Sequence, residues 1–172
     1  MANFSPTNQK GYFQRYINLV DENDLLSAFA IQQESLEHFL NGISEIDSQY
    51  RYAADKWSVK EILQHISDCE RIFGYRALCI ARGEKQPLPG FDENDYAELS
   101  KADHQTWSML VEEFMTVRRS TWLLFKSLDQ SMLNREGTAN GQVMKAETIG
   151  FILLGHYYHH EKILKDRYLN HK

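Results

Sequence analysis

The chain has 172 residues, and its 24 acidic and 19 basic side chains give a formal net charge of -5. Its 42% hydrophobic and 25% charged residues are ordinary values for a globular protein, which excludes general disorder. An acidic balance with no run of basic residues argues against a nucleic-acid-binding surface. We therefore expect a single domain over residues 1–172, with residues 1–20 as an N-terminal extension.

The sequence predicts a cytoplasmic protein with no membrane partner. Residues 1–10 lack the basic and apolar regions of a signal peptide. The longest apolar stretch, 149–154, is far too short to cross a membrane. Cys69 and Cys79 lie about 15 Å apart along one predicted helix, too far for a disulfide, which suits a reducing compartment.

Apolar residues recur at helical spacing in four long segments, and no run of alternating strand residues is evident. The segments are 21–40, 58–82, 100–128 and 146–168. In the second segment, Ser58 and Glu61 form a capping-box pattern and Gly83 follows the end. This organisation predicts an all-α four-helix bundle.

The linkers between these segments are longer than the roughly 2–8 residues usual in helix bundles. They cover residues 41–56, 83–99 and 129–145. Linkers of this length permit crossover connections, so a simple up-down-up-down order is not assumed. They can also cover one end of the bundle and shape a site.

Histidines on two predicted helices point toward the interior. His156 and His160 are about 40° apart and one turn along, so they share a face of the fourth helix. His65 points inward from the second helix, on the same face as Ile62 and Cys69. Three neutral imidazoles can bind one divalent metal and leave a coordination position open for water or substrate. Imidazoles suit Zn, Ni, Fe or Cu.

Other interpretations of these residues stay open. A single inward histidine is more often a hydrogen-bonded core residue than a ligand. Cys69 is either a thiolate ligand or, more commonly, a small buried hydrophobe. Asp68, about 60° from His65, either orients a ligand imidazole or lies exposed at the helix edge. Three further histidines without comparable partners are expected to be solvated: His38, His104 and His171.

Arg76 is unusual because it falls on the apolar face of the second helix. A buried guanidinium needs a carboxylate or a ligand anion. Glu70 and Glu113 are the candidate partners, whereas Arg118 and Arg119 on the third helix are expected on a solvated face. No glycine-rich phosphate loop and no strand–turn–helix nucleophile motif is present in the sequence.

The chain resembles the DinB/YfiT-like superfamily in two motifs, KWSVKEILQH at 56–65 and GHYYHH at 155–160. The resemblance covers about residues 12–168. It implies a four-helix bundle with up-down-down-up connectivity. It also implies a homodimer and a divalent metal, Zn or Ni, bound by three histidines: His65, His156 and His160.

The better understood members of that superfamily resemble transferases and isomerases that use bacillithiol, mycothiol or similar thiols, and others resemble metal-dependent hydrolases. The resemblance therefore implies a metal-dependent enzyme. It would transfer a low-molecular-weight thiol to a small-molecule substrate, or hydrolyse that substrate. Asp68 and Arg76 are candidate supporting residues. The alternative is a non-catalytic helical bundle that binds a metal or mediates an interaction.

Overall fold

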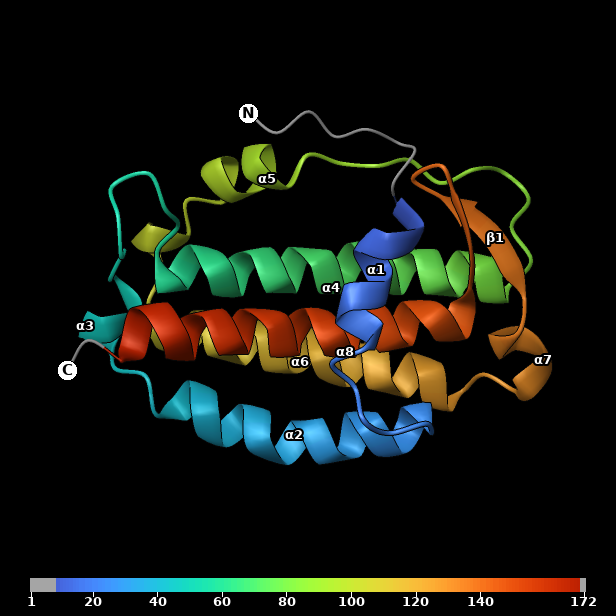
Figure 1. Ribbon diagram of the computed structural model, residues 1–172, viewed down its shortest axis with the longest axis horizontal. Coiled ribbons are helices and arrows are strands. Elements are labelled where there is room, and N and C mark those ends of the chain that lie inside the picture. The colour runs from blue at the N-terminus through green and yellow to red at the C-terminus, as the bar shows by residue number, and fades with distance from the viewer. Residues whose placement is uncertain (1–8, 171–172) are drawn as a thin grey trace.

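Four amphipathic segments form the long helices of the computed structural model, which describes residues 9–170 (Figure 1). The prediction of an all-α four-helix bundle is confirmed. The four helices are α2 (Leu25–Asn41), α4 (Val59–Ala81), α6 (Trp107–Lys126) and α8 (Ala146–Ile163).

The bundle has the up-down-down-up order that the family resemblance implied. Helices α2 and α8 run in one direction, and α4 and α6 run in the other (Figure 1). Two parallel neighbours require a long connection, and the chain from the end of α4 returns along the bundle before α6 begins. This return segment contains α5 (Glu93–Ser100) and the short helix η2 (Ala102–His104).

Local capping fixes where the helices begin. The side chain of Ser58 accepts a hydrogen bond from the backbone of Glu61 at 3.0 Å, and the Glu61 carboxylate accepts one from the backbone of Ser58 at 2.9 Å. The predicted capping box is therefore confirmed. The third predicted helix begins later than expected, at Trp107 instead of residue 100. Lys101 adopts a left-handed conformation with φ 51°, and Thr106 caps the new start.

All three linkers contain secondary structure that the sequence patterns did not predict, and α5, described above, lies mostly in the second. The first linker contains α3 (Glu45–Ser48), and the third contains α7 (Gln130–Leu133) and an antiparallel hairpin. The hairpin pairs β1 (Glu136–Ala139) with β2 (Gln142–Lys145). Asn140 and Gly141 form its turn with φ values of 49° and 73°, as an Asn-Gly hairpin turn requires.

Helix α1 (Gln9–Ile17) lies across α8, so part of the expected N-terminal extension packs on the bundle. The two backbones approach closely at Gly155, where an added Cβ would lie 1.9 Å from the carbonyl oxygen of Tyr16. Beyond α8 the chain continues as η3 (Leu164–Leu169). The predicted lack of a signal peptide concerns residues 1–10, and residues 1–8 lie outside the described part.

The helices bury their apolar faces in two clusters. One cluster includes Phe29, Phe125 and Leu153, and the other includes Phe114 and Tyr157, whose rings stack at 5.8 Å. None of the helices within residues 9–170 is long and apolar enough to cross a membrane.

Candidate metal centre

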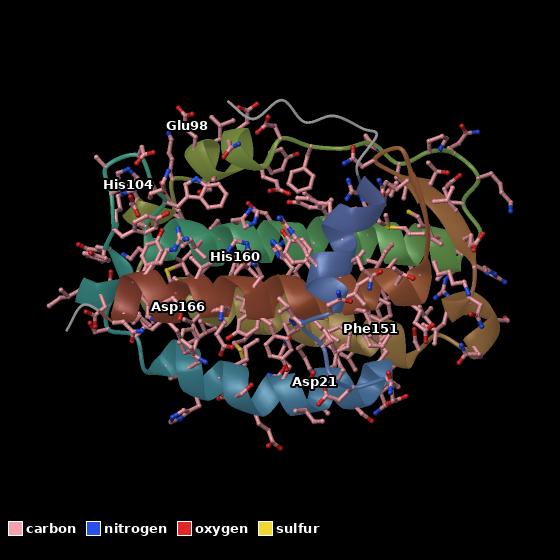
Figure 2. The ribbon with its side chains drawn as sticks, viewed as in Figure 1. Asp21, Glu98, His104, Phe151, His160 and Asp166 are labelled. Atoms are coloured by element: carbon pink, nitrogen blue, oxygen red, sulfur yellow. The ribbon has the colours of Figure 1, made fainter. Side chains whose placement is uncertain are left out.

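Three imidazoles converge between α4 and α8. The Nε2 atom of His156 lies 3.1 Å from Nε2 of His65 and 3.1 Å from Nε2 of His160. All three side chains are buried. Figure 2 shows His160 in the interior between the two helices. The structure thus brings together the three histidines that the sequence singled out.

The number of contacts at Nε2 of His156, more than their length, favours a shared cation over hydrogen bonds. A neutral imidazole has one donor nitrogen and one acceptor nitrogen. The Nε2 atom of His156 therefore carries either one proton or one lone pair, yet it faces two other Nε2 atoms at 3.1 Å. Two nitrogens bound to one tetrahedral ion at about 2.0–2.1 Å lie about 3.4 Å apart. The observed spacing is close to that value.

Burial keeps the three imidazoles uncharged. It lowers the pKa of His65 to about 4, with a smaller contribution from nearby His159. Burial and the neighbouring histidines also hold the pKa values of His156 and His160 well below the ordinary histidine value. Neutral imidazole is the form that binds a metal, so the ligands are ready at neutral pH.

Cys69 offers a further ligand atom at the same place. Its Sγ lies 3.8 Å from both ring nitrogens of His65. One ligand atom each from His65, Cys69 and His156 lie within 4.8 Å of one another. Burial raises the pKa of the Cys69 thiol well above its ordinary value, so the thiol is protonated when no cation is bound. Both interpretations of Cys69, ligand and small buried residue, fit this position.

Aromatic rings wall in the imidazoles. The Trp57 ring lies 4.9 Å from the His65 ring. The Tyr16 ring meets the His156 ring edge-on, with centroids 5.3 Å apart and an interplanar angle of 90°. The role of α1 was not predicted from the sequence. The sequence feature that could have indicated this helix is the pair Tyr12 and Tyr16, which lie one helical turn apart and contact each other.

The site is closed on one side and open on another. A small cavity with room for about one water molecule borders His156, Phe73 and Glu93 of α5. On the other side, a groove of about 300 Å³ borders His160 and Trp57. A small molecule in this groove would meet the cluster at His160.

Asp68 does not contact the imidazole cluster. Its carboxylate accepts a hydrogen bond from the side-chain amide of Gln64 at 3.0 Å and lies 3.7 Å from the guanidinium of Arg71. These contacts favour the helix-edge interpretation of Asp68 over a role in orienting His65.

Arg76 is buried as expected, but it pairs with neither candidate carboxylate. Glu113 instead pairs with Arg71 at 2.6 Å, and Glu70 pairs with a residue of α6. The guanidinium of Arg76 donates a hydrogen bond to the carbonyl oxygen of Pro89 at 2.7 Å. The predicted ion pairs of Arg76 are therefore wrong, because other cations reach both carboxylates.

The partner of Glu70 is Arg118, which was expected on a solvated face. That prediction is wrong: Arg118 is only 2% exposed and lies 3.1 Å from the Glu70 carboxylate. It also donates a hydrogen bond to the side-chain oxygen of Gln32 at 3.0 Å. Gln32 belongs to α2, which covers this face of α6 and removes it from water.

The other histidines and arginines expected in solvent are found there. Arg119, His38 and His104 are exposed, and His104 lies at the periphery in Figure 2. His171 lies outside the described residues.

Comparison with known proteins agrees with this architecture. The family model of the DinB superfamily matches residues 28–164. Among solved structures, the chain is similar to YfiT from Bacillus subtilis, whose structure is titled a "probable metal-dependent hydrolase with an unusual four-helix bundle topology". That match has a TM-score of 0.69 and 13% identity, and it covers 96% of this chain and 89% of YfiT. At this identity the likeness shows the fold alone. No curated protein sequence matched the chain.

Proposed function

The chain belongs to the DinB superfamily, and from this premise we propose that it is a metal-dependent enzyme. One divalent cation would be held by His65, His156 and His160. The observation that supports this proposal is the pair of 3.1 Å contacts that Nε2 of His156 makes with two other buried imidazoles. The single proton or lone pair on that nitrogen serves only one ordinary two-centre hydrogen bond.

Zn or Ni would suit this ligand set. A cation there would supply a Lewis acid with an open position, where a water or a thiol would lose its proton more readily. The side chains of Trp57 and Tyr16 cover His65 and His156 and exclude bulk water from those directions. The groove beside His160 gives a small molecule its route.

We propose transfer of a low-molecular-weight thiol to an electrophilic small molecule as the reaction. The thiol sulfur forms a bond to carbon, the leaving group departs with the bonding electrons, and the thiol proton passes to solvent. Hydrolysis is the second candidate, and the likeness to YfiT, titled a probable metal-dependent hydrolase, favours it.

The metal site is tested first, on untagged protein stripped with a chelator. Titration with ZnCl2 or NiCl2 in a calorimeter is expected to give one ion per chain. His156→Ala should abolish binding, because His156 contacts both other imidazoles. The matched control is His38→Ala, which removes an exposed histidine and should change nothing. Wild-type protein that binds neither ion would overturn the proposal.

Two further variants identify the third ligand. If His160→Ala loses binding and Cys69→Ala retains it, the three-histidine set is supported. The reverse result would assign the ion to His65, Cys69 and His156, the set within 4.8 Å.

The reaction is tested on the metal-loaded protein. Bacillithiol or glutathione with monochlorobimane reports thiol transfer, and p-nitrophenyl acetate reports hydrolysis. Activity that His156→Ala removes and His38→Ala retains would support an enzyme. Stoichiometric metal binding with neither activity would favour the non-catalytic metal-binding bundle.

Two expectations from the sequence stay predictions. Light scattering after size-exclusion chromatography tests the homodimer, and cell fractionation tests the cytoplasmic location.

A further inference from the structure

A second groove, of about 310 Å³, lies between α4 and the return segment that contains α5. It shares no lining residue with the cavity or the groove at the histidines. Its wall is largely apolar and aromatic: Ile72, Leu88, Pro89, Phe91 and Tyr96 contribute to it. Tyr96 is 47% exposed, so a ligand in this groove would gain an aromatic contact without displacing a core residue.

Arg76 lines this groove and is only 3% exposed. Its guanidinium carbon lies 4.8 Å from the ring centre of Phe73 and 5.8 Å from that of Phe91. The Nη2 atom of Arg76 donates a hydrogen bond to the carbonyl oxygen of Pro89. Among residues 9–170 no carboxylate forms an ion pair with Arg76. A buried cation in this state lacks the partner that would compensate its loss of hydration.

The charges around the groove specify the ligand. Arg71, the other cation in the wall, already lies 2.6 Å from Glu113 and 3.7 Å from Asp68. Arg76 therefore supplies the one positive charge of the described wall that has no carboxylate partner. One charge calls for a monoanion, whereas a doubly charged phosphate would also meet repulsion from the two carboxylates near Arg71.

We propose that this groove binds a small organic carboxylate, whose carboxylate group pairs with Arg76 and whose apolar part lies against Phe91 and Tyr96. The planar guanidinium matches a carboxylate with two parallel hydrogen bonds. This site is independent of the metal centre and of its proposed reaction.

The test titrates metal-free protein with benzoate, using benzyl alcohol as an uncharged probe of similar shape. Amide shifts in an NMR titration are expected along α4 and around residues 88–96. Benzoate should bind at least about tenfold more tightly than benzyl alcohol, which corresponds to about 1.4 kcal/mol. Equal binding of the two probes, or benzoate shifts centred on the histidines, would overturn the proposal. Inorganic phosphate binding as tightly as benzoate would overturn the choice of a carboxylate.

Variants test the role of Arg76 itself. Arg76→Gln should reduce benzoate affinity to that of benzyl alcohol, whereas Arg82→Gln removes an exposed arginine near the end of the same helix and should not. If Arg76→Gln does not fold, Tyr96→Ala replaces it, because Tyr96 is exposed and its loss should weaken benzoate binding severalfold. Unchanged affinity in the folded variant would overturn the proposal.

Discussion

The bundle buries two polar clusters, and they differ in whether their members complement one another. In one cluster, Arg118 meets the opposite charge of Glu70 and donates a hydrogen bond to Gln32. In the other, the Nε2 atoms of two uncharged imidazoles, His65 and His160, both lie 3.1 Å from Nε2 of His156. The first cluster compensates its charge within the chain. The second has no charge to compensate, and one proton or lone pair on His156 faces two other nitrogens.

The two clusters also differ in what encloses them. Arg118 lies among the bundle helices, and the carbonyl of Leu154 on α8 accepts a further hydrogen bond from Gln32. The imidazoles instead border a groove at His160 and are covered by the added helix α1 through Tyr16. Glu70 also borders a groove, between α4 and α6, so the two clusters differ in the cover that α1 adds over the imidazoles and not in the presence of an opening.

The largest effect is expected when the ion pair between Glu70 and Arg118 is removed. Glu70→Gln leaves the charge of Arg118 buried without a carboxylate, so the free energy of unfolding should fall by about 3–5 kcal/mol. Urea denaturation followed by circular dichroism measures it. Asp166→Asn is the control, because it removes an ion pair at 3.9 Å between two exposed side chains and should have little effect. A Glu70→Gln protein as stable as the wild type would contradict the comparison.

A smaller effect should follow when the packing of α1 on α8 is disrupted. In Gly155→Ala the new Cβ meets the Tyr16 carbonyl oxygen at 1.9 Å, and backbone cannot rotate aside. We expect a loss of about 1–3 kcal/mol and faster tryptic cleavage at Arg15. Gly150→Ala is the matched control on α8, where the Cβ meets the tip of Leu25 at 2.7 Å and that side chain can shift. Equal cleavage in both variants would show that α1 does not depend on this contact.

The smallest effect, counted per pH unit, concerns the stability of the metal-free protein. Folding lowers the pKa of His65 to about 4 from an unfolded value of about 6.5, so the unfolded chain binds more protons at low pH. The contribution of neutral His65 to the free energy of unfolding is fully present above pH 6.5. It is lost between pH 6.5 and 4, by up to about 1.4 kcal/mol per pH unit. His65→Gln should flatten the slope in urea titrations at pH 7, 6 and 5, whereas His104→Gln should not. If the free energy of unfolding changes equally with pH in the wild type and in both variants, the assignment of this effect to His65 is wrong.

The sequence predicted the parts of the fold that depend on local chemistry. Helical spacing located the four long helices, and the Ser58–Glu61 capping box placed one start correctly. The inward direction of His156 and His160 followed from their spacing of one turn. The hairpin at residues 136–145 was missed although Asn140-Gly141 is a strong turn signal, because strands of four residues carry little periodicity.

The errors concern contacts made across the bundle. Nothing next to Arg118 in the sequence shows that α2 covers it, since Gln32 lies 86 residues away. Glu70 and Glu113 were the predicted partners of Arg76. In the structure Glu70 pairs with Arg118 and Glu113 pairs with Arg71. Helical spacing identifies the face on which a side chain lies. It does not identify the residue that the side chain meets there.

The docking of α1 on α8 has a consequence for the order in which the site is built. During synthesis Tyr16 leaves the ribosome early. Gly155, against which the Tyr16 backbone packs, is made on the order of ten seconds later. Until then the nascent chain holds His65 without the two imidazoles of α8. The contact of Tyr16 with His156 is therefore among the last to form, and before translation is nearly complete only His65 of the three imidazoles has been made.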